Sequence, residues 1–331
     1  MERVYSCNRF PCIPFRRARY RGVVAVLIVG LLCAAGAHAD AGSDALRAAA
    51  RDNDAAEAQR LIADGADVNA KDEYGTTVLM LAAQSNAADA AKLLLAAKAD
   101  VNARDNDGAT ALMHAAGRNA ADAAKLLLAA KADVKATNNY GQTALMLAAR
   151  YNAADVAKLL IAARSDVKAR DKDGWSVLMH AAAWNAADVT RLLLAAKADV
   201  NAKNDTGMTA LMWAAERNAA DAAKLLLAAK ADVNAKNDTG MTPLMWAAEQ
   251  NAVDAAEVLL AAGAHVNVKS DYGTTALMVA AQSNAVGVAR LLLAAQADMN
   301  AKNDDGFTAL MYALKNYARD VAALLDAAGA Q

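Results

Sequence analysis

The stretch NDTGMTALMWAAE, residues 204–216, returns 33 positions later as NDTGMTPLMWAAE, residues 237–249, changed only where Ala210 gives way to Pro243. The period extends along most of the chain. A glycine marks it at every thirty-third position, at Gly75, Gly108, Gly141, Gly174, Gly207, Gly240, Gly273 and Gly306. Self-similarity at a fixed period of this size is typical of proteins built from stacked units. The repeat therefore decides the fold.

Each repeat carries the signals of one tight turn and two short helices. Polar residues precede the glycine, which can take the positive φ that such a turn needs, and a Thr or Ser two positions later is suited to cap a helix. The apolar segment Leu-Met-x-Ala-Ala follows, and an asparagine such as Asn86 or Asn119 closes that helix in the left-handed region. A second helix, AAKLLLAA, has an aspartate such as Asp89 in its first turn, where the helix dipole favours it.

Helices this short must pack against neighbours, since isolated helices below about 12 residues are marginal in water. The two ends of the array show where this stacking stops. Arg60 replaces the first leucine of the second-helix triplet in the opening unit, residues 43–71, and Asp326 replaces the third in the closing unit. One polar flank at each end is typical of the capping units of a solenoid.

The repeat resembles the ankyrin repeat family, whose 33-residue pattern is close to DxxGxTPLHxAAxxGHxxVVxLLLxxGAxVNA. Residues 242–248, TPLMWAA, come nearest to its central motif, and the likeness covers residues 43–331. The resemblance implies an all-α fold, an ankyrin-repeat solenoid of about nine helix-turn-helix units linked by tight turns and short hairpins. The capping unit is residues 43–71, and eight units of 33-residue period follow to residue 331.

Three positions depart from the family pattern. The His of TPLH is Met in all eight full units, so the hydrogen bonds of that His cannot be carried over: Met80, Met113, Met146, Met179, Met212, Met245, Met278 and Met311. The Gly-His between the helices reads mostly Asn-Ala. The glycine that ends the second helix is kept at Gly65, Gly263 and Gly329 but is Lys98, Lys131, Arg164, Lys197, Lys230 or Gln296 elsewhere. A left-handed backbone at these side chains would cost about 1–2 kcal/mol.

Residues 1–39 differ in kind from the repeats. A basic segment, residues 16–21, precedes an uncharged run, residues 22–36, and Ala37-His38-Ala39 has the small-x-small form of a cleavage site. We expect a secretory signal peptide at 1–39, cleaved after Ala39, and an ankyrin repeat domain at 40–331 that is periplasmic or secreted. The alternative is an uncleaved segment that anchors the protein in a membrane, which the shortness of the apolar run disfavours.

The leader contains every cysteine of the chain and an excess of positive charge. Cys7, Cys12 and Cys33 lie in it, together with six arginines and one glutamate. The remaining chain has 29 basic and 35 acidic residues, a formal net charge of −6. This sign disfavours a nucleic-acid partner, which would require a clustered basic surface. No apolar run of the repeats approaches the roughly 20 residues of a membrane span, so we expect no membrane contact after cleavage.

The polar residues predict no catalytic site, metal site or cofactor. His114 and His180 occupy the same slot two units apart, roughly 20 Å by layer spacing, so they cannot share a metal. Copper binding or an oxidant sink is the alternative use of the methionine column, but methionines one layer apart cannot ligate one ion together, and core packing is favoured. Because catalysis needs unlike groups that converge, we predict that the protein is not an enzyme.

Partner contacts are expected at the slots that vary between units, beside the turn glycine and along the first helix. In the ankyrin family these places form the concave binding face. The predicted contact residues are Tyr74, Tyr140, Tyr151, Trp175, Trp184, Met208, Trp213, Met241, Trp246, Tyr272 and Phe307. Packing between layers is the favoured role of Trp213 and Trp246, whereas Trp175 and Trp184 are predicted to be exposed hot-spot residues.

These observations together predict a monomeric, non-enzymatic scaffold that binds another protein through its concave face. The alternative is a structural or stress-protective protein of the cell envelope that has no single dedicated partner.

Overall fold

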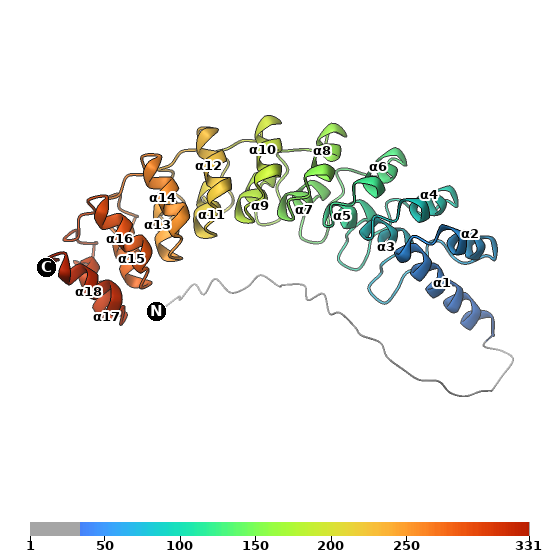
Figure 1. The fold of residues 1–331 in the computed structure, drawn as a ribbon, viewed down its shortest axis with the longest axis horizontal. Coiled ribbons are helices and arrows are strands. Elements are labelled where there is room, and N and C mark those ends of the chain that lie inside the picture. The colour runs from blue at the N-terminus through green and yellow to red at the C-terminus, as the bar shows by residue number, and fades with distance from the viewer. Residues whose placement is uncertain (1–33, 331) are drawn as a thin grey trace.

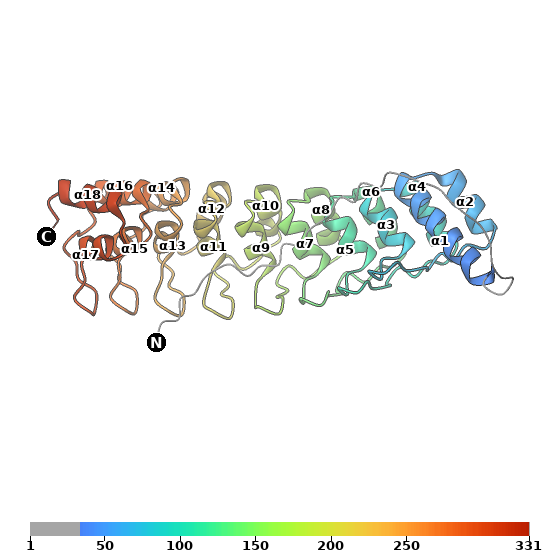
Figure 2. The ribbon, with the colours of Figure 1, turned by 90° about the horizontal axis from the view of Figure 1, so that it is seen from below.

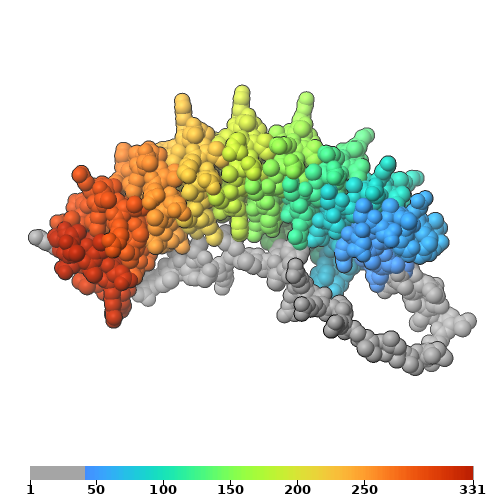
Figure 3. All heavy atoms as spheres, viewed as in Figure 1, coloured from blue at the N-terminus to red at the C-terminus, as the bar shows by residue number. Residues whose placement is uncertain are grey.

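The predicted all-α solenoid is confirmed by the computed structural model, which describes the backbone of residues 34–330 and the side chains of residues 42–330. These residues form 18 α-helices and no strands, with two isolated antiparallel bridges, Lys71 with Thr77 and Arg170 with Ser176, at the bases of turns. The helices stand in nine pairs along an arch (Figure 1), and the side chains fill the space between the pairs, giving a continuous body (Figure 3).

The first helices of the units lie on the inner side of the arch and the second helices on its outer side (Figure 1). The turns project from one flank (Figure 2). We call the surface made by the turn tips and first helices the concave face. The first helices are α1 (Ala34–Asp52), α3 (Val78–Gln84), α5 (Ala111–Ala116), α7 (Ala144–Arg150), α9 (Val177–Ala183), α11 (Ala210–Glu216), α13 (Pro243–Glu249), α15 (Ala276–Gln282) and α17 (Ala309–Lys315). The second helices are α2 (Ala55–Ala63), α4 (Ala88–Ala96), α6 (Ala121–Ala129), α8 (Ala154–Ala162), α10 (Ala187–Ala195), α12 (Ala220–Ala228), α14 (Val253–Ala261), α16 (Val286–Ala294) and α18 (Arg319–Ala327).

The methionine that replaces the family histidine has two roles at the start of the first helix. In seven units its backbone N–H donates to the hydroxyl of the Thr or Ser cap, as Met80 does to Thr77 at 3.3 Å. In six units its Sδ accepts the N–H of the cap residue at 3.3–3.5 Å. Its side chain is fully buried in every unit except the last, where Met311 is 45% exposed. The packing role of the methionine column is confirmed, and sulfur, a weak acceptor, completes the cap.

The asparagine that ends the first helix joins each unit to the next. It is left-handed as predicted, with φ between 51° and 56° from Asn53 to Asn284. The second helices after α2 begin after an alanine, which cannot cap them, whereas Asp54 caps α2. The asparagine of the preceding unit supplies the missing acceptor at all eight junctions, as Asn218 Oδ1 accepts the N–H of Ala255 at 2.9 Å. Asn218 Nδ2 also donates to Asp254 at 3.0 Å.

The residue that ends the second helix is left-handed even where it is not glycine. Lys98, Lys131, Arg164, Lys197, Lys230 and Gln296 have φ between 60° and 65°. A basic side chain at the carboxyl end of a helix interacts favourably with the helix dipole, typically by 0.3–1 kcal/mol, which offsets part of the strain. Gly207 combines a positive φ with a close approach, because a Cβ there would collide with Asp238 Oδ1 of the next turn.

The leader lies almost wholly outside the described residues. Helix α1 begins at Ala34 and so runs through the expected cleavage position at Ala39, while residues 1–33, the rest of the predicted signal peptide, are not described. Cleavage and the domain boundary at residue 40 stay predictions. Among the helices that the structure describes, none combines the length and apolar character needed to span a membrane.

Glycine substitutions at the two left-handed positions of one unit should have opposite effects. Asn218→Gly keeps the backbone freedom but deletes the cap across the junction, so the free energy of unfolding should fall by about 1 kcal/mol. Lys230→Gly removes strain and no side-chain hydrogen bond, so stability should be unchanged or rise by up to about 1 kcal/mol. Urea unfolding followed by circular dichroism measures both. An Asn218→Gly protein as stable as Lys230→Gly would contradict the role of the asparagine.

Candidate functional site

One slot of the first helix, directly after the buried methionine, changes in nearly every unit. Its occupants are Leu81, His114, Leu147, His180, Trp213, Trp246, Val279 and Tyr312. Polar occupants are held by the first residue of their own turn: His114 Nε2 lies 2.9 Å from Asp105 Oδ2, and His180 Nε2 lies 2.8 Å from Asp171 Oδ2. Burial raises the pKa of Asp105, but hydrogen bonds from His114 and two backbone N–H groups outweigh it, so that pKa lies below its ordinary value.

Trp175 is not exposed, and the prediction of its exposure was wrong. Only 8% of its surface is accessible. The ring extends from the turn over the first helices, where its centroid lies 4.0 Å from that of Trp213 in the next unit and 5.2 Å from that of His180. The side chain therefore covers the layer beside it instead of projecting from the turn tip.

Several other predicted contact residues are also covered by neighbouring layers. Met208 and Trp213 are 3% and 8% exposed, and Met241, Trp246 and Phe307 are half-buried. Packing between layers, the favoured role of the tryptophan pair, is confirmed for Trp213. The indole Nε1 atoms of Trp213 and Trp246 are buried and have no hydrogen-bond acceptor among the described residues.

The remaining predicted contact residues are exposed aromatic side chains, as expected. Tyr74 and Tyr272 are 67% exposed, and Tyr140, Tyr151 and Trp184 are between 46% and 55% exposed. Tyr151 and Trp184 occupy the same slot in consecutive units, directly after α7 and α9. Each of two neighbouring layers of the concave face therefore carries one exposed aromatic side chain at this position.

Arg150, the last residue of α7, was missed by the sequence reasoning. Its Cζ lies 4.9 Å from the ring centroid of Trp184 and 5.6 Å from that of Tyr151, within the range of cation–π contacts. The side chain is half-buried, its Nε is buried without an acceptor, and no described carboxylate pairs with it. The signal in the sequence was the variability of its slot, which Gly117, Ala183 and Glu216 also occupy.

Glu216 brings an opposite charge to the same slot two units later. It is only 8% exposed, and among the described residues it makes no hydrogen bond or ion pair through its carboxylate. Burial raises the pKa of Glu216 above its ordinary value of about 4.5, Arg217 opposes this effect and Glu249 of the next unit reinforces it. Glu249 occupies the same slot at the end of α13 and is exposed.

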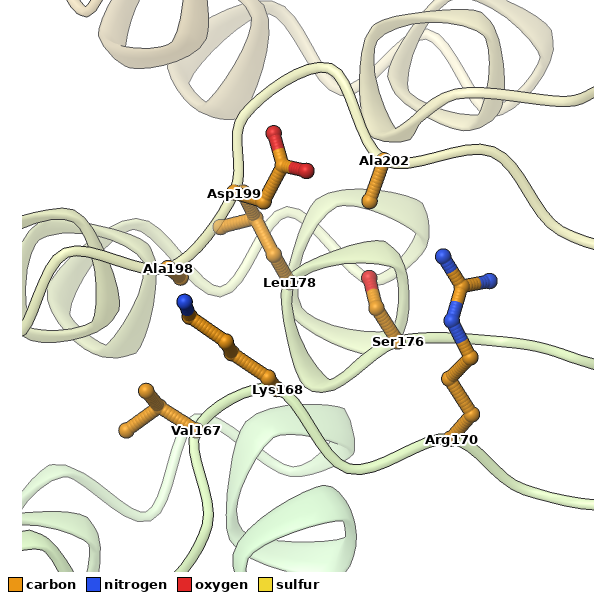
Figure 4. Close-up of a pocket in the computed structure, with 8 residues that line it drawn as sticks. All are labelled: Val167, Lys168, Arg170, Ser176, Leu178, Ala198, Asp199 and Ala202. Carbon is orange, nitrogen blue, oxygen red and sulfur yellow. The ribbon is translucent and has the colours of Figure 1, made fainter.

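A separate hollow of about 230 Å³ lies away from these residues, between the links of two units (Figure 4). It occurs where a lateral hydrogen bond is missing. At most junctions an asparagine of one link accepts a backbone N–H of the next, as Asn201 does from Asp232 at 2.9 Å. Lys168 holds that position here and cannot accept the N–H of Asp199, and both residues line the hollow. The hollow contains none of the predicted contact residues.

The concave face from α7 to α13 thus contains three kinds of group. They are a guanidinium stacked on aromatic rings, buried tryptophan side chains and two carboxylates. Within the described residues, no three His, Cys, Asp or Glu side chains gather in a way that could hold a metal ion. The arrangement offers charged and aromatic contacts to a binding partner.

A protein-family model described as "Ankyrin repeats (3 copies)" matches overlapping segments at residues 17–105, 98–171, 154–237, 178–270, 215–303 and 262–331. Together the segments cover residues 17–331. No curated protein matches the chain.

The buried carboxyl of Glu216 predicts a pH-dependent stability. Because the folded state holds this proton more tightly than the unfolded chain, the protein loses stability as the pH rises from about 4.5 through the raised pKa. Burial also raises the pKa of Glu249, so Glu216→Gln should remove only the part of this loss that Glu216 causes, and its Tm should still exceed that of the unsubstituted protein at pH 7. The difference should vanish below about pH 4. The control is Glu257→Gln, the same change at an exposed position of α14, and an equal gain there would refute the assignment.

Proposed function

Because the chain belongs to the ankyrin repeat family, we propose that it is a non-enzymatic scaffold that binds a partner protein through its concave face. Ankyrin repeats are in general protein–protein interaction modules, and the family is typically non-enzymatic. The outer helices present nearly the same residues in every unit, whereas the concave face differs from unit to unit. Because the fold is constant and only the residues of the concave face differ between units, this face is suited to recognise one particular partner.

The observation that carries this proposal is the cluster of Arg150, Tyr151 and Trp184. Two large aromatic side chains are left more than half exposed, and a guanidinium rests against them without a carboxylate. Trp, Tyr and Arg are the residues most enriched in binding hot spots, which lie near the centre of an interface. The cluster lies in the middle of the array, so the units on both sides of it can contribute the outer contacts of an interface.

The place of action that we propose is the periplasm or the extracellular space. The support is the form of residues 1–39, with basic residues, a short apolar run and a small-x-small sequence. We propose that the remaining chain acts as a monomer and contacts neither nucleic acid nor membrane. Mass spectrometry of the amino terminus of the purified protein tests cleavage after Ala39, and an intact leader would favour the anchored form.

Trp184→Ala should weaken partner binding without loss of the fold. A pull-down from the envelope fraction, identified by mass spectrometry, supplies the partner, and calorimetry should then show an affinity loss of about tenfold or more. The Tm should stay within about 2 °C, because the ring is exposed. The contrasting variant is Trp213→Ala, which should lower the free energy of unfolding by about 3–5 kcal/mol, since that ring is buried. Undiminished binding by Trp184→Ala would favour the structural or stress-protective role.

A further inference from the structure

The charges of the concave face occur in a fixed order along the array. Arg150, Ala183, Glu216 and Glu249 occupy one slot in four consecutive units, at the ends of α7, α9, α11 and α13. The order is a cation, a neutral layer and two carboxylates. Because the four residues share one position of the repeat, they lie in a row on one face of the molecule.

Arg150 is arranged to receive an anion. A guanidinium has five N–H donors in a rigid fork that matches a carboxylate. The ring of Trp184 holds this fork in place, and no acceptor among the described residues uses it. A half-buried guanidinium without an acceptor is costly, because its lost hydration is not replaced. A carboxylate from a partner would replace it.

Glu216 is arranged to receive a cation. It is more than nine-tenths buried and receives no hydrogen bond from any described residue. Trp213 lies three positions earlier on the same helix, so the two side chains share one face of α11, and Glu249 adds a second carboxylate one layer on. Carboxylates next to aromatic faces suit an ammonium or guanidinium, which gains both an ion pair and a cation–π contact. The neighbouring Arg217 weakens the negative potential but leaves two carboxylates against one cation.

The distance between the two positions fixes the length of the segment that can reach both. They are two layers apart, about 16–20 Å at 8–10 Å per layer. An extended chain advances about 3.3 Å per residue, so five or six residues span this distance. A single small ion cannot contact both positions, whereas an extended polypeptide can.

We propose that the concave face binds an extended segment of its partner protein that places an acidic side chain on Arg150 and, five or six residues away, a basic side chain on Glu216, with Glu249 as a second carboxylate one layer on. This inference rests on the proposed function and specifies the chemistry of the partner. The charges fix the direction of the segment along the arch. In the reverse direction its basic side chain would face Arg150 and its acidic side chain would face Glu216, so that like charges would repel at both positions.

A peptide selection tests the proposal with the whole protein as it is purified. A displayed library of random 12-residue peptides should yield binders enriched in an acidic and a basic residue five or six positions apart. Selection on Arg150→Gln should lose the preference for the acidic residue alone, and selection on Glu216→Gln the preference for the basic residue alone. Arg191→Gln and Glu257→Gln, the same changes on the outer helices α10 and α14, should leave both preferences intact.

Affinities measured with one selected peptide test the two charge contacts quantitatively. Arg150→Gln and Glu216→Gln should each weaken its binding by about tenfold. Neutralising the acidic residue of the peptide should cause no further loss in the Arg150→Gln variant, as a double-mutant cycle requires for a direct contact. Thermal unfolding of each variant shows that it remains folded.

The outcomes separate this inference from the proposed function. Binders without the charge pair, or with a spacing that differs from five or six, overturn the inference. If a captured partner is nonetheless sensitive to Trp184→Ala, the proposed function stands. If the library gives no binder and no captured partner is sensitive to Trp184→Ala, both are overturned.

Discussion

The structure depends on one constraint, which is that no unit after the first can satisfy the start of its own second helix. An alanine occupies the cap position of that helix in eight units, and the acceptor comes from an asparagine of the unit before, as at Asn218 and Ala255. The same asparagine must be left-handed to end its own first helix. One residue type therefore closes one helix and opens another, and each unit is stable only in the company of its neighbour. This explains why the repeat is so uniform where units meet.

The junctions between units are uniform, so variation is left to the concave face. Substitutions at its buried positions depend on one another. Several buried side chains there touch the next layer or their own turn, so substitutions at those positions are linked in pairs. The two histidines of the first-helix slot each have an aspartate at the start of the turn, and Tyr312 has Asn303, which donates to its hydroxyl at 2.9 Å. The ring of Trp175 likewise packs against that of Trp213 in the next unit. Variation is thus possible wherever a neighbouring partner changes with it.

The fold was predictable because its signals are periodic and local. Turn glycines, helix caps and left-handed asparagines depend on the residue type and on a few neighbours along the chain. The candidate site was predictable only in part. The exposure of Trp184 followed from its slot, but the burial of Trp175 depends on a side chain turning onto the next layer, which no local pattern encodes. Arg150 and Glu216 were missed for a related reason, since a charged residue at the end of a helix is usually solvated and only the neighbouring layers show that these two are not.

The concave face from α7 to α13 contains several local conflicts. Six buried side-chain nitrogen or oxygen atoms of the described residues lack a hydrogen-bond partner, and three of them belong to Arg150, Trp213 and Trp246. Glu216 adds a charged side chain that is only 8% exposed, although the same slot carries an uncharged amide at Gln84 and Gln282 in other units. Glutamine there would avoid the cost of desolvating a charge. Sequences that break such local rules usually do so at functional sites. The position of these conflicts therefore supports binding at this part of the array on grounds independent of the family.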